Sequence, residues 1–211
     1  MRWPLPDPEE TALRELLCEM LRLFYAKGWV SGTGGGICGR LRDGRIVVAP
    51  TGVHKERVGP EDLFIVDPSD ESVISSAIDV SLKPSECTPI FAAIVRAGAG
   101  SVVHSHALAP VLAADHGKGS VLTIADLEML KGLPGVSNTD VHLVPVIDNT
   151  AFEPELTGEV ERVLGEERFA SARAILVRDH GAYIWGDTVW DAKKHAEVYH
   201  FLFEATVARR R

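Results

Sequence analysis

The sequence predicts a three-layer α/β/α domain, in which helices cover both faces of a central sheet. Two observations lead to this fold class: helical periodicity alternates with short β-rich runs, and no shift in composition marks a linker. The length of 211 residues suits one domain over residues 1–211, and 45% apolar with 25% charged residues is ordinary globular usage. Periodicity leaves the order and direction of the strands open.

The first predicted element is an amphipathic helix. Asp7 is expected as its N-cap and Pro8 at its first position, and leucines then recur at helical spacing up to Gly28. The other predicted elements are strands at 45–50 and 63–67, a helix capped by Ser85 and reaching 98, a strand at 101–105, a helix at 107–115, a short helical piece around 124–132, a strand at 141–147, a helix near 153–165, strands at 174–181 and 182–186, and a helix from about 188 to 208.

Charge and cysteine content limit the partners and the compartment. The formal net charge of −8 argues against nucleic acid and anionic membranes as partners, because both require a basic patch. Three widely spaced cysteines indicate neither a disulfide framework nor a thiolate zinc site. The first residues lack an apolar signal core, and no window approaches the ~18 apolar residues of a membrane span. We therefore expect a soluble, cytoplasmic protein.

The stretch "VVHSHALAP" at 102–110 carries two histidines at strand spacing. Residues i and i+2 of a strand share a face, so His104 and His106 can point at one metal ion, or else make ordinary hydrogen bonds at a strand end. His180 follows a second aliphatic strand and provides a third imidazole. Three imidazoles with an open fourth position form a catalytic zinc arrangement, which predicts one Zn²⁺ per subunit. Ordinary surface or packing roles in turns or helices are expected for His54, His116, His142, His195 and His200.

Two glycine-containing segments are candidates for binding a phosphate. "SGTGGGICG" lacks the Gly-Lys-Ser/Thr of a nucleotide loop and leads from a helix into a strand, which excludes a nucleoside triphosphate site. This segment is either a tight connection or a place where backbone amides approach a ligand. The second segment, "APTGVHKE", is either a cradle for a phosphate monoester or a turn with a solvent-facing lysine. The residues concerned are Gly32, Thr33, Gly34, Gly35, Thr51, Gly52 and Lys55, with Ser85 as a further contact.

Two carboxylates are candidates for acid/base work. Glu86 stands at a predicted helix start, where the helix dipole alone is a sufficient reason for a glutamate. Glu128 lies in "DLEMLKG", where apolar neighbours favour a raised pKa. Each of these two glutamates can instead have a purely structural role.

These motifs, in this order, resemble the class II aldolase/adducin family over about residues 9 to 208. Within the family, "SGTGGGI", "APTGVHKER", "CTPIF", "VVHSHA", "LEMLKG", "VPVIDNT" and "LVRDHGAYIWG" are most similar to members that dehydrate 5-methylthioribulose 1-phosphate in methionine salvage. The resemblance implies zinc on His104, His106 and His180, and an acid/base at Glu128. It also implies that Cys87 lies near the thioether of the substrate, and that Lys55, Gly52, Ser85 and the glycine cluster contact its phosphate. Finally, it implies a homotetramer with active sites at subunit boundaries.

One departure keeps an alternative open. Where the animal dehydratases have glutamine, this chain has Glu86, which aligns with the catalytic glutamate of the sugar-phosphate aldolases that act on fuculose or rhamnulose 1-phosphate. The Gly-Thr-Gly-Gly-Gly run and "LEMLKG" argue against that aldolase activity. A third alternative, a non-catalytic assembly module like adducin, is expected to lack the metal ligands that this chain retains.

Overall fold

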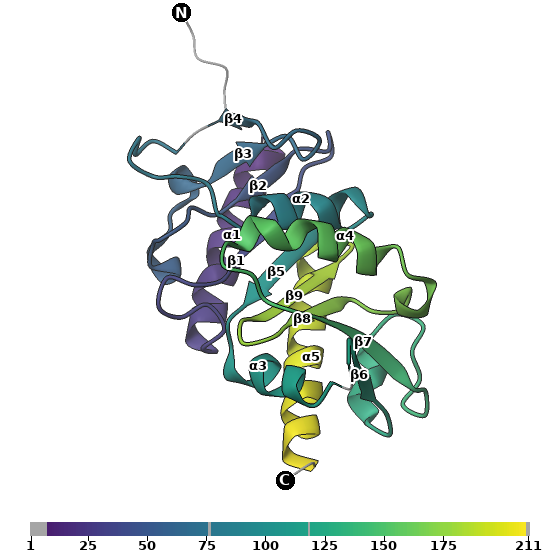
Figure 1. Cartoon of the computed structure of the whole chain (residues 1–211). Helices are drawn as coiled ribbons and strands as arrows, with labels where there is room; N and C mark the ends of the chain where they lie inside the picture. The colour runs from purple at the N-terminus through teal and green to yellow at the C-terminus, as the bar shows by residue number, and fades with distance from the viewer. Residues whose placement is uncertain (1–7, 76, 118, 210–211) are drawn as a thin grey trace, which may run out of the picture.

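The computed structural model describes residues 8–75, 77–117 and 119–209, in which a mixed sheet lies between two layers of helices (Figure 1). This arrangement confirms the predicted fold class. The nine strands found in the described residues have the order β4-β3-β2-β1-β5-β9-β8-β7-β6, and neighbours are antiparallel except β7 and β8. Their bounds are β1 Gly36–Arg40, β2 Ile46–Val48, β3 Phe64–Val66, β4 Val73–Ser75, β5 Ser101–Ser105, β6 Val121–Ile124, β7 His142–Ile147, β8 Ala174–Val177 and β9 Gly181–Gly186.

Helices divide between the two faces of the sheet, and each face has its own apolar core. One layer contains α1 (Pro8–Ala26), α3 (Leu108–Asp115) and α5 (Val189–Arg209), and the other contains α2 (Thr88–Arg96) and α4 (Thr157–Leu164) (Figure 1). Short 3-10 helices connect these elements: η1 Lys55–Arg57, η2 Pro60–Asp62, η3 Glu128–Gly132, η4 Glu153–Leu156 and η5 Glu167–Phe169. No helix within the described ranges is both long and apolar enough to cross a membrane.

The first helix shows how the sequence produces this packing. Its leucines face β1, where Gly39 leaves room for them: a Cβ on Gly39 would lie 2.8 Å from the side chain of Leu13. The helix begins at Pro8 and ends shortly before Gly28, whose φ of +74° turns the chain away. The predicted cap, Asp7, lies outside the described residues.

Three local predictions are wrong. The helix after Ser85 begins only at Thr88, because Ser85 forms a preceding turn in which its carbonyl accepts the Thr88 N–H at 3.0 Å. The predicted helical piece around 124–132 forms only at η3, Glu128–Gly132; Ile124 instead ends β6, a strand too short to show a period of two. The strand predicted at 141–147 is β7, so the turn or helix expected for His142 is wrong; His142 begins this strand and packs in the core with its Nε2 2.9 Å from the hydroxyl of Tyr199.

Candidate metal centre

The centre forms where β5 ends beside the turn between β8 and β9. His104 is in register with Tyr183 of β9, and their rings stack at 4.1 Å between centroids. His106 follows the end of β5, and His180 occupies the turn that leads into β9. Sheet register therefore brings together three imidazoles that are far apart in the sequence.

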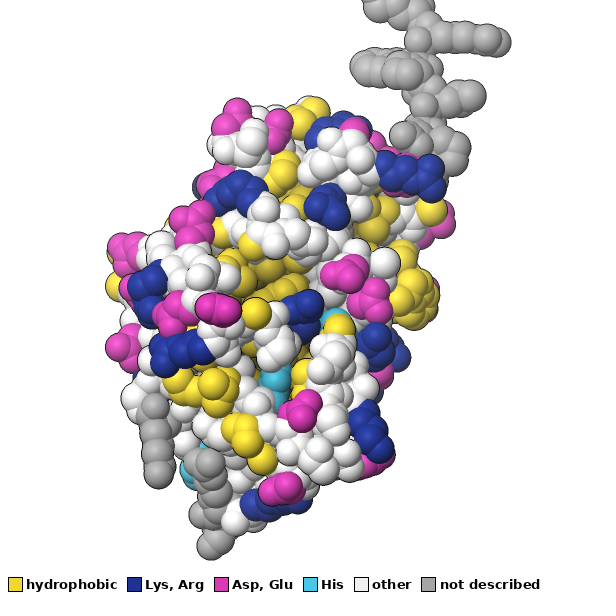
Figure 2. All heavy atoms as spheres, turned by 90° about the vertical axis from the view of Figure 1, so that its right-hand side faces the viewer, with side chains coloured by type: hydrophobic (Ala, Val, Ile, Leu, Met, Phe, Trp, Pro, Cys, Tyr) yellow, Lys and Arg dark blue, Asp and Glu magenta, His cyan; other side chains and the backbone are white. Residues whose placement is uncertain are grey.

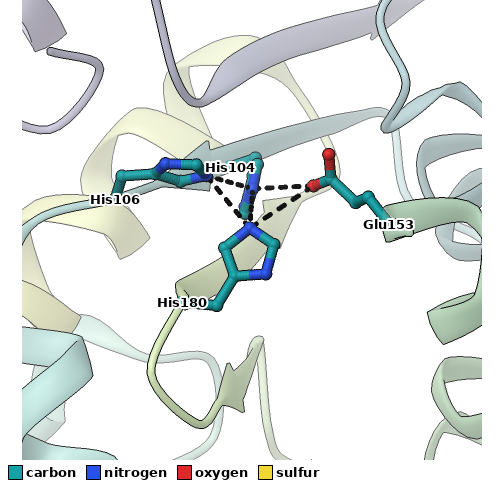
Figure 3. Close-up of side chains that lie close together, drawn as sticks. All are labelled: His104, His106, Glu153 and His180. Carbon is teal, nitrogen blue, oxygen red and sulfur yellow. Dashed lines mark hydrogen bonds and ion pairs between the residues drawn. The ribbon is translucent and has the colours of Figure 1, made fainter. Parts of the chain in front are cut away.

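The three Nε2 atoms face one another (Figure 3). They are separated by 2.8 Å for His104 and His106, 3.2 Å for His104 and His180, and 3.1 Å for His106 and His180. A tetrahedral zinc ion about 2.05 Å from each nitrogen would require N···N distances of about 3.3 Å. The donor set and its spacing thus fit a divalent metal ion.

The second nitrogen of two rings orients the first. His104 Nδ1 lies 3.2 Å from the carbonyl of Ala182, and His180 Nδ1 lies 3.0 Å from the side-chain oxygen of Asn149. Both partners are acceptors, so each Nδ1 carries the hydrogen and each Nε2 of the neutral ring has a free lone pair. Burial, with the neighbouring imidazoles, lowers the pKa of His106 to about 3 and also lowers the pKa of His180. Those two rings are neutral at pH 7, as metal ligands must be.

Two glycines permit this close approach. A Cβ on Gly34 would lie 2.5 Å from Nδ1 of His106, and a Cβ on Gly181 would lie 2.0 Å from the carbonyl oxygen of Ser105. Gly181 also has a φ of +153°, which other residues rarely adopt. Gly34 therefore leaves the space that the His106 ring occupies, and Gly181 lets the start of β9 lie against the backbone at the end of β5.

A carboxylate that the sequence analysis did not single out joins the centre. Oε1 of Glu153, at the start of η4, lies 2.9 Å from His104 Nε2 and 3.7 Å from His180 Nε2 (Figure 3). The same four residues form a group able to hold a metal ion. Burial raises the pKa of Glu153, but the close His104 ring and the hydrogen bond from the Tyr183 hydroxyl outweigh it and hold this pKa well below the usual range. In the sequence, the only signal for Glu153 is its place at the start of a predicted helix. Many solvated glutamates occupy that position, so the signal does not indicate a site residue.

The strand also positions Ser105, which points to the opposite face of the sheet from the two ligands that flank it. Its hydroxyl lies 2.8 Å from Nε2 of His200 on α5, and His200 Nδ1 lies 2.6 Å from the carbonyl of Ala196. The His200 ring stacks on Trp29 at 3.8 Å between centroids. A buried network on the α5 side thus fixes the end of β5.

The segments predicted to hold phosphate meet at Lys55. This side chain is only 2% exposed, so it is not a solvent-facing lysine, and burial lowers its pKa. Its Nζ donates to the carbonyl of Thr33 at 2.8 Å and to that of Val53 at 3.2 Å, which joins the glycine cluster to the loop that contains Thr51 and Gly52. In this cluster Gly32, Thr33 and Gly35 have φ between +61° and +69°, and Gly52 has +66°.

Ser85 and Cys87 lie beside this junction. The Ser85 N–H donates to the Ala49 carbonyl at 3.0 Å, and both residues are buried. The Cys87 thiol donates to Glu153 Oε1 at 3.2 Å, and burial raises the pKa of Cys87 well above its usual value. The predicted substrate-contact residues therefore reach the histidine centre through Cys87 and Glu153.

The two predicted acid/base residues are outside this cluster. Glu86 is exposed, one residue before the buried Cys87. The Glu128 side chain is 72% exposed and pairs with Lys131 at 2.7 Å and with the Asn138 amide at 2.9 Å. The desolvation expected for Glu128 is absent within the chain.

The sequence and the fold of this chain are similar to those of known proteins. Residues 15–207 match the family described as Class II Aldolase and Adducin N-terminal domain, and the chain belongs to this family. It is 41% identical to methylthioribulose-1-phosphate dehydratase of Gallus gallus, over 92% of this chain and 82% of that protein, and 39% identical to the Aspergillus niger protein of the same name, over 95% and 88%. The structure of L-fuculose-1-phosphate aldolase from Thermus thermophilus superposes with a TM-score of 0.66 at 25% identity, over 95% of this chain and 96% of that one.

Proposed function

We propose that this chain is a hydro-lyase that converts 5-methylthioribulose 1-phosphate to 2,3-diketo-5-methylthiopentyl 1-phosphate in methionine salvage, with one Zn²⁺ per subunit. The observation that carries the proposal is the convergence of the Nε2 atoms of His104, His106 and His180. It occurs in a chain about two-fifths identical to the named dehydratases over most of both lengths.

His104, His106 and His180 would hold the metal. When bound, it supplies a Lewis acid for the carbonyl oxygen on carbon 2 of the substrate, which acidifies the hydrogen on carbon 3. The neutral imidazoles suit this role, because their ring partners leave the Nε2 lone pairs available.

Dehydration requires two proton transfers. Loss of the proton on carbon 3 gives an enediolate, and departure of the hydroxyl on carbon 4 as water gives an enol that tautomerises to the diketone. In this proposal Glu128 protonates the leaving hydroxyl. Because its side chain is exposed, a neighbouring copy can present Glu128 to the metal centre, and the proposal therefore includes a homotetramer with active sites at subunit boundaries.

The phosphate would lie where the backbone of Gly32 to Gly35 meets Thr51, Gly52 and Ser85. Lys55 has two of its three N–H groups bonded to carbonyls, which leaves one positive donor for a phosphate oxygen. The buried thiol of Cys87 would contact the thioether end of the substrate. On the face shown in Figure 2, lysine and arginine are interspersed with acidic side chains and form no broad basic patch, which argues against binding of a polyanion there.

The second candidate function is a class II sugar-phosphate aldolase, which would form the same kind of enediolate by breaking the bond between carbons 3 and 4. Glu86 and the likeness to the Thermus aldolase favour it. Against it, the exposed Glu86 is not among the residues grouped at the histidines. A cytoplasmic setting is part of the main proposal and is supported by three free, buried cysteines.

Product analysis separates the two reactions. The purified protein is incubated with 5-methylthioribulose 1-phosphate and, separately, with fuculose or rhamnulose 1-phosphate. We expect the diketone from the first substrate and no lactaldehyde from the others. Lactaldehyde without diketone would overturn the proposal.

A further inference from the structure

Glu153 is the acidic side chain that the described part of the chain brings to the three histidines. It comes from η4, on the α2/α4 side of the sheet, and its side chain is 15% exposed. Its contacts converge on one atom: Oε1 lies close to His104, His180, Cys87 and the hydroxyl of Tyr183. A carboxylate oxygen with this many neighbours is positioned, not merely solvated.

The contacts are of two kinds. Tyr183 and Cys87 each have a hydrogen to donate to Oε1, so they hold the carboxylate. Nε2 of His104 is different, because Nδ1 of the same ring faces the Ala182 carbonyl and carries the hydrogen in the neutral ring. A lone pair of His104 then faces a carboxylate oxygen at 2.9 Å. Two acceptors at this distance repel each other unless a cation lies between them or His104 is protonated on both nitrogens.

The whole group favours the cation. His106 and His180 direct their own Nε2 atoms at the same point, 2.8 and 3.2 Å from His104 Nε2. A doubly protonated His104 would have a single Nε2–H for three acceptors, the two ring nitrogens and Oε1 of Glu153, whereas one cation can bind all of them. Three nitrogens and one carboxylate oxygen are a complete tetrahedral set for zinc.

We propose that Glu153 is the fourth metal ligand in the substrate-free enzyme and, once the oxygens of the substrate replace it, the base that removes the proton from carbon 3. The proposal rests on the function proposed above. In this step the C3–H bond breaks, its electron pair becomes the double bond between carbons 2 and 3, the carbonyl electrons move to the oxygen on carbon 2, and the proton moves to Glu153. Tyr183 and Cys87 keep the released carboxylate beside the reacting carbon.

This assignment supplies what the two predicted carboxylates lack. Glu86 is exposed, and Glu128 is paired on the surface with Lys131. Glu153 is already at the centre within one chain, so a carbon acid whose carbonyl lies at the metal is within reach of its oxygen. Glu128 can then act only on the leaving hydroxyl, as the proposed function requires.

Metal binding tests the ligand role independently of activity. Metal-free wild type, Glu153→Gln and Glu153→Ala are titrated with Co²⁺, and affinity is measured by chelator competition. The matched control is Glu155→Gln, an exposed glutamate in the same 3-10 helix. We expect both Glu153 variants to bind Co²⁺ about tenfold or more weakly and to show altered d–d absorption bands, while Glu155→Gln matches wild type. Unchanged affinity and spectrum in folded Glu153→Ala would overturn the ligand role.

Isotope exchange tests the proton transfer. Loss of deuterium from 5-methylthioribulose 1-phosphate labelled at carbon 3 is followed for the zinc-loaded proteins. Glu153→Gln should slow this loss by about 10²-fold or more, and Glu155→Gln should leave it unchanged. A rate within threefold of wild type in Glu153→Gln would overturn the role as base.

The two proposals fail separately. If wild type forms no diketone but Glu153→Ala weakens Co²⁺ binding, the ligand role stands and the dehydratase function falls. If wild type forms the diketone while both Glu153 variants keep the Co²⁺ affinity, the Co²⁺ spectrum and the exchange rate, the function stands and the role of Glu153 falls. Circular dichroism and thermal melting of each variant establish that it is folded.

Discussion

The histidine cluster at the end of β5 and the two surface carboxylates are built in opposite ways. Sheet register places His104, the second nitrogens of His104 and His180 have acceptor partners, and the three imidazoles converge within one chain. Glu86 lies in the turn before α2 and Glu128 at the start of η3, and both side chains are exposed to solvent. Under the proposed function, the electrophilic half of the active site is preformed, whereas Glu128 would meet the metal centre only through another copy of the chain.

Removing one imidazole should have the largest effect. His180→Ala leaves two ring nitrogens and Glu153, and once the substrate replaces Glu153 only the two nitrogens would remain, so we expect weakened metal binding and a fall in kcat on the order of 10³-fold or more. Metal analysis and diketone formation are the measurements, with the exposed His54→Gln as the control. Full activity in metal-free His180→Ala would show that the centre is structural only.

Glu128→Gln tests the other half of the comparison. We expect kcat to fall by about 10²–10⁴-fold while metal content and thermal stability stay at wild-type values, because the side chain is exposed. If each active site combines the histidines of one subunit with Glu128 of another, mixing Glu128→Gln with inactive His180→Ala subunits should restore part of the activity. If no activity returns after subunit exchange, with both variants folded, Glu128 acts at the active site of its own subunit or does not take part in the reaction.

Lys55→Met should act on binding of the phosphate. Loss of the buried cation is expected to raise KM about tenfold or more with a smaller change in kcat, and to cost roughly 1–3 kcal/mol of stability through the unpaired carbonyls of Thr33 and Val53. Steady-state kinetics and urea unfolding measure the two effects, with the exposed Lys83→Met as control. An unchanged KM in the folded variant would remove Lys55 from the phosphate site.

His200→Gln should have the smallest effect, which we expect in the pH dependence of the free energy of unfolding. Burial lowers the pKa of His200 to about 4, below the ~6.5 of an unfolded histidine. Between these values the unfolded state binds more protons, so stability falls as pH falls from about 6.5 to 4. In metal-free protein, His200→Gln should flatten that fall, and a slope equal to wild type would show that His200 does not contribute to it.

The fold class and the three histidines were predictable because each depends on a short-range pattern. A period of two places His104 and His106 on one face, and an aliphatic run followed by His180 and Gly181 marks a second strand end. Glu153 was not predictable, since its approach to His104 depends on how η4 packs over the sheet. The start of α2 and the strand β6 were missed because a local turn at Ser85 and a four-residue strand carry no periodic signal.

Diffraction at the zinc absorption edge tests the central claim most directly. Crystals of the purified, zinc-loaded protein should show a single anomalous peak per chain, about 2.0–2.1 Å from the Nε2 atoms of His104, His106 and His180. A folded chain whose imidazoles enclose no such peak, or whose only peak lies elsewhere, would contradict the account.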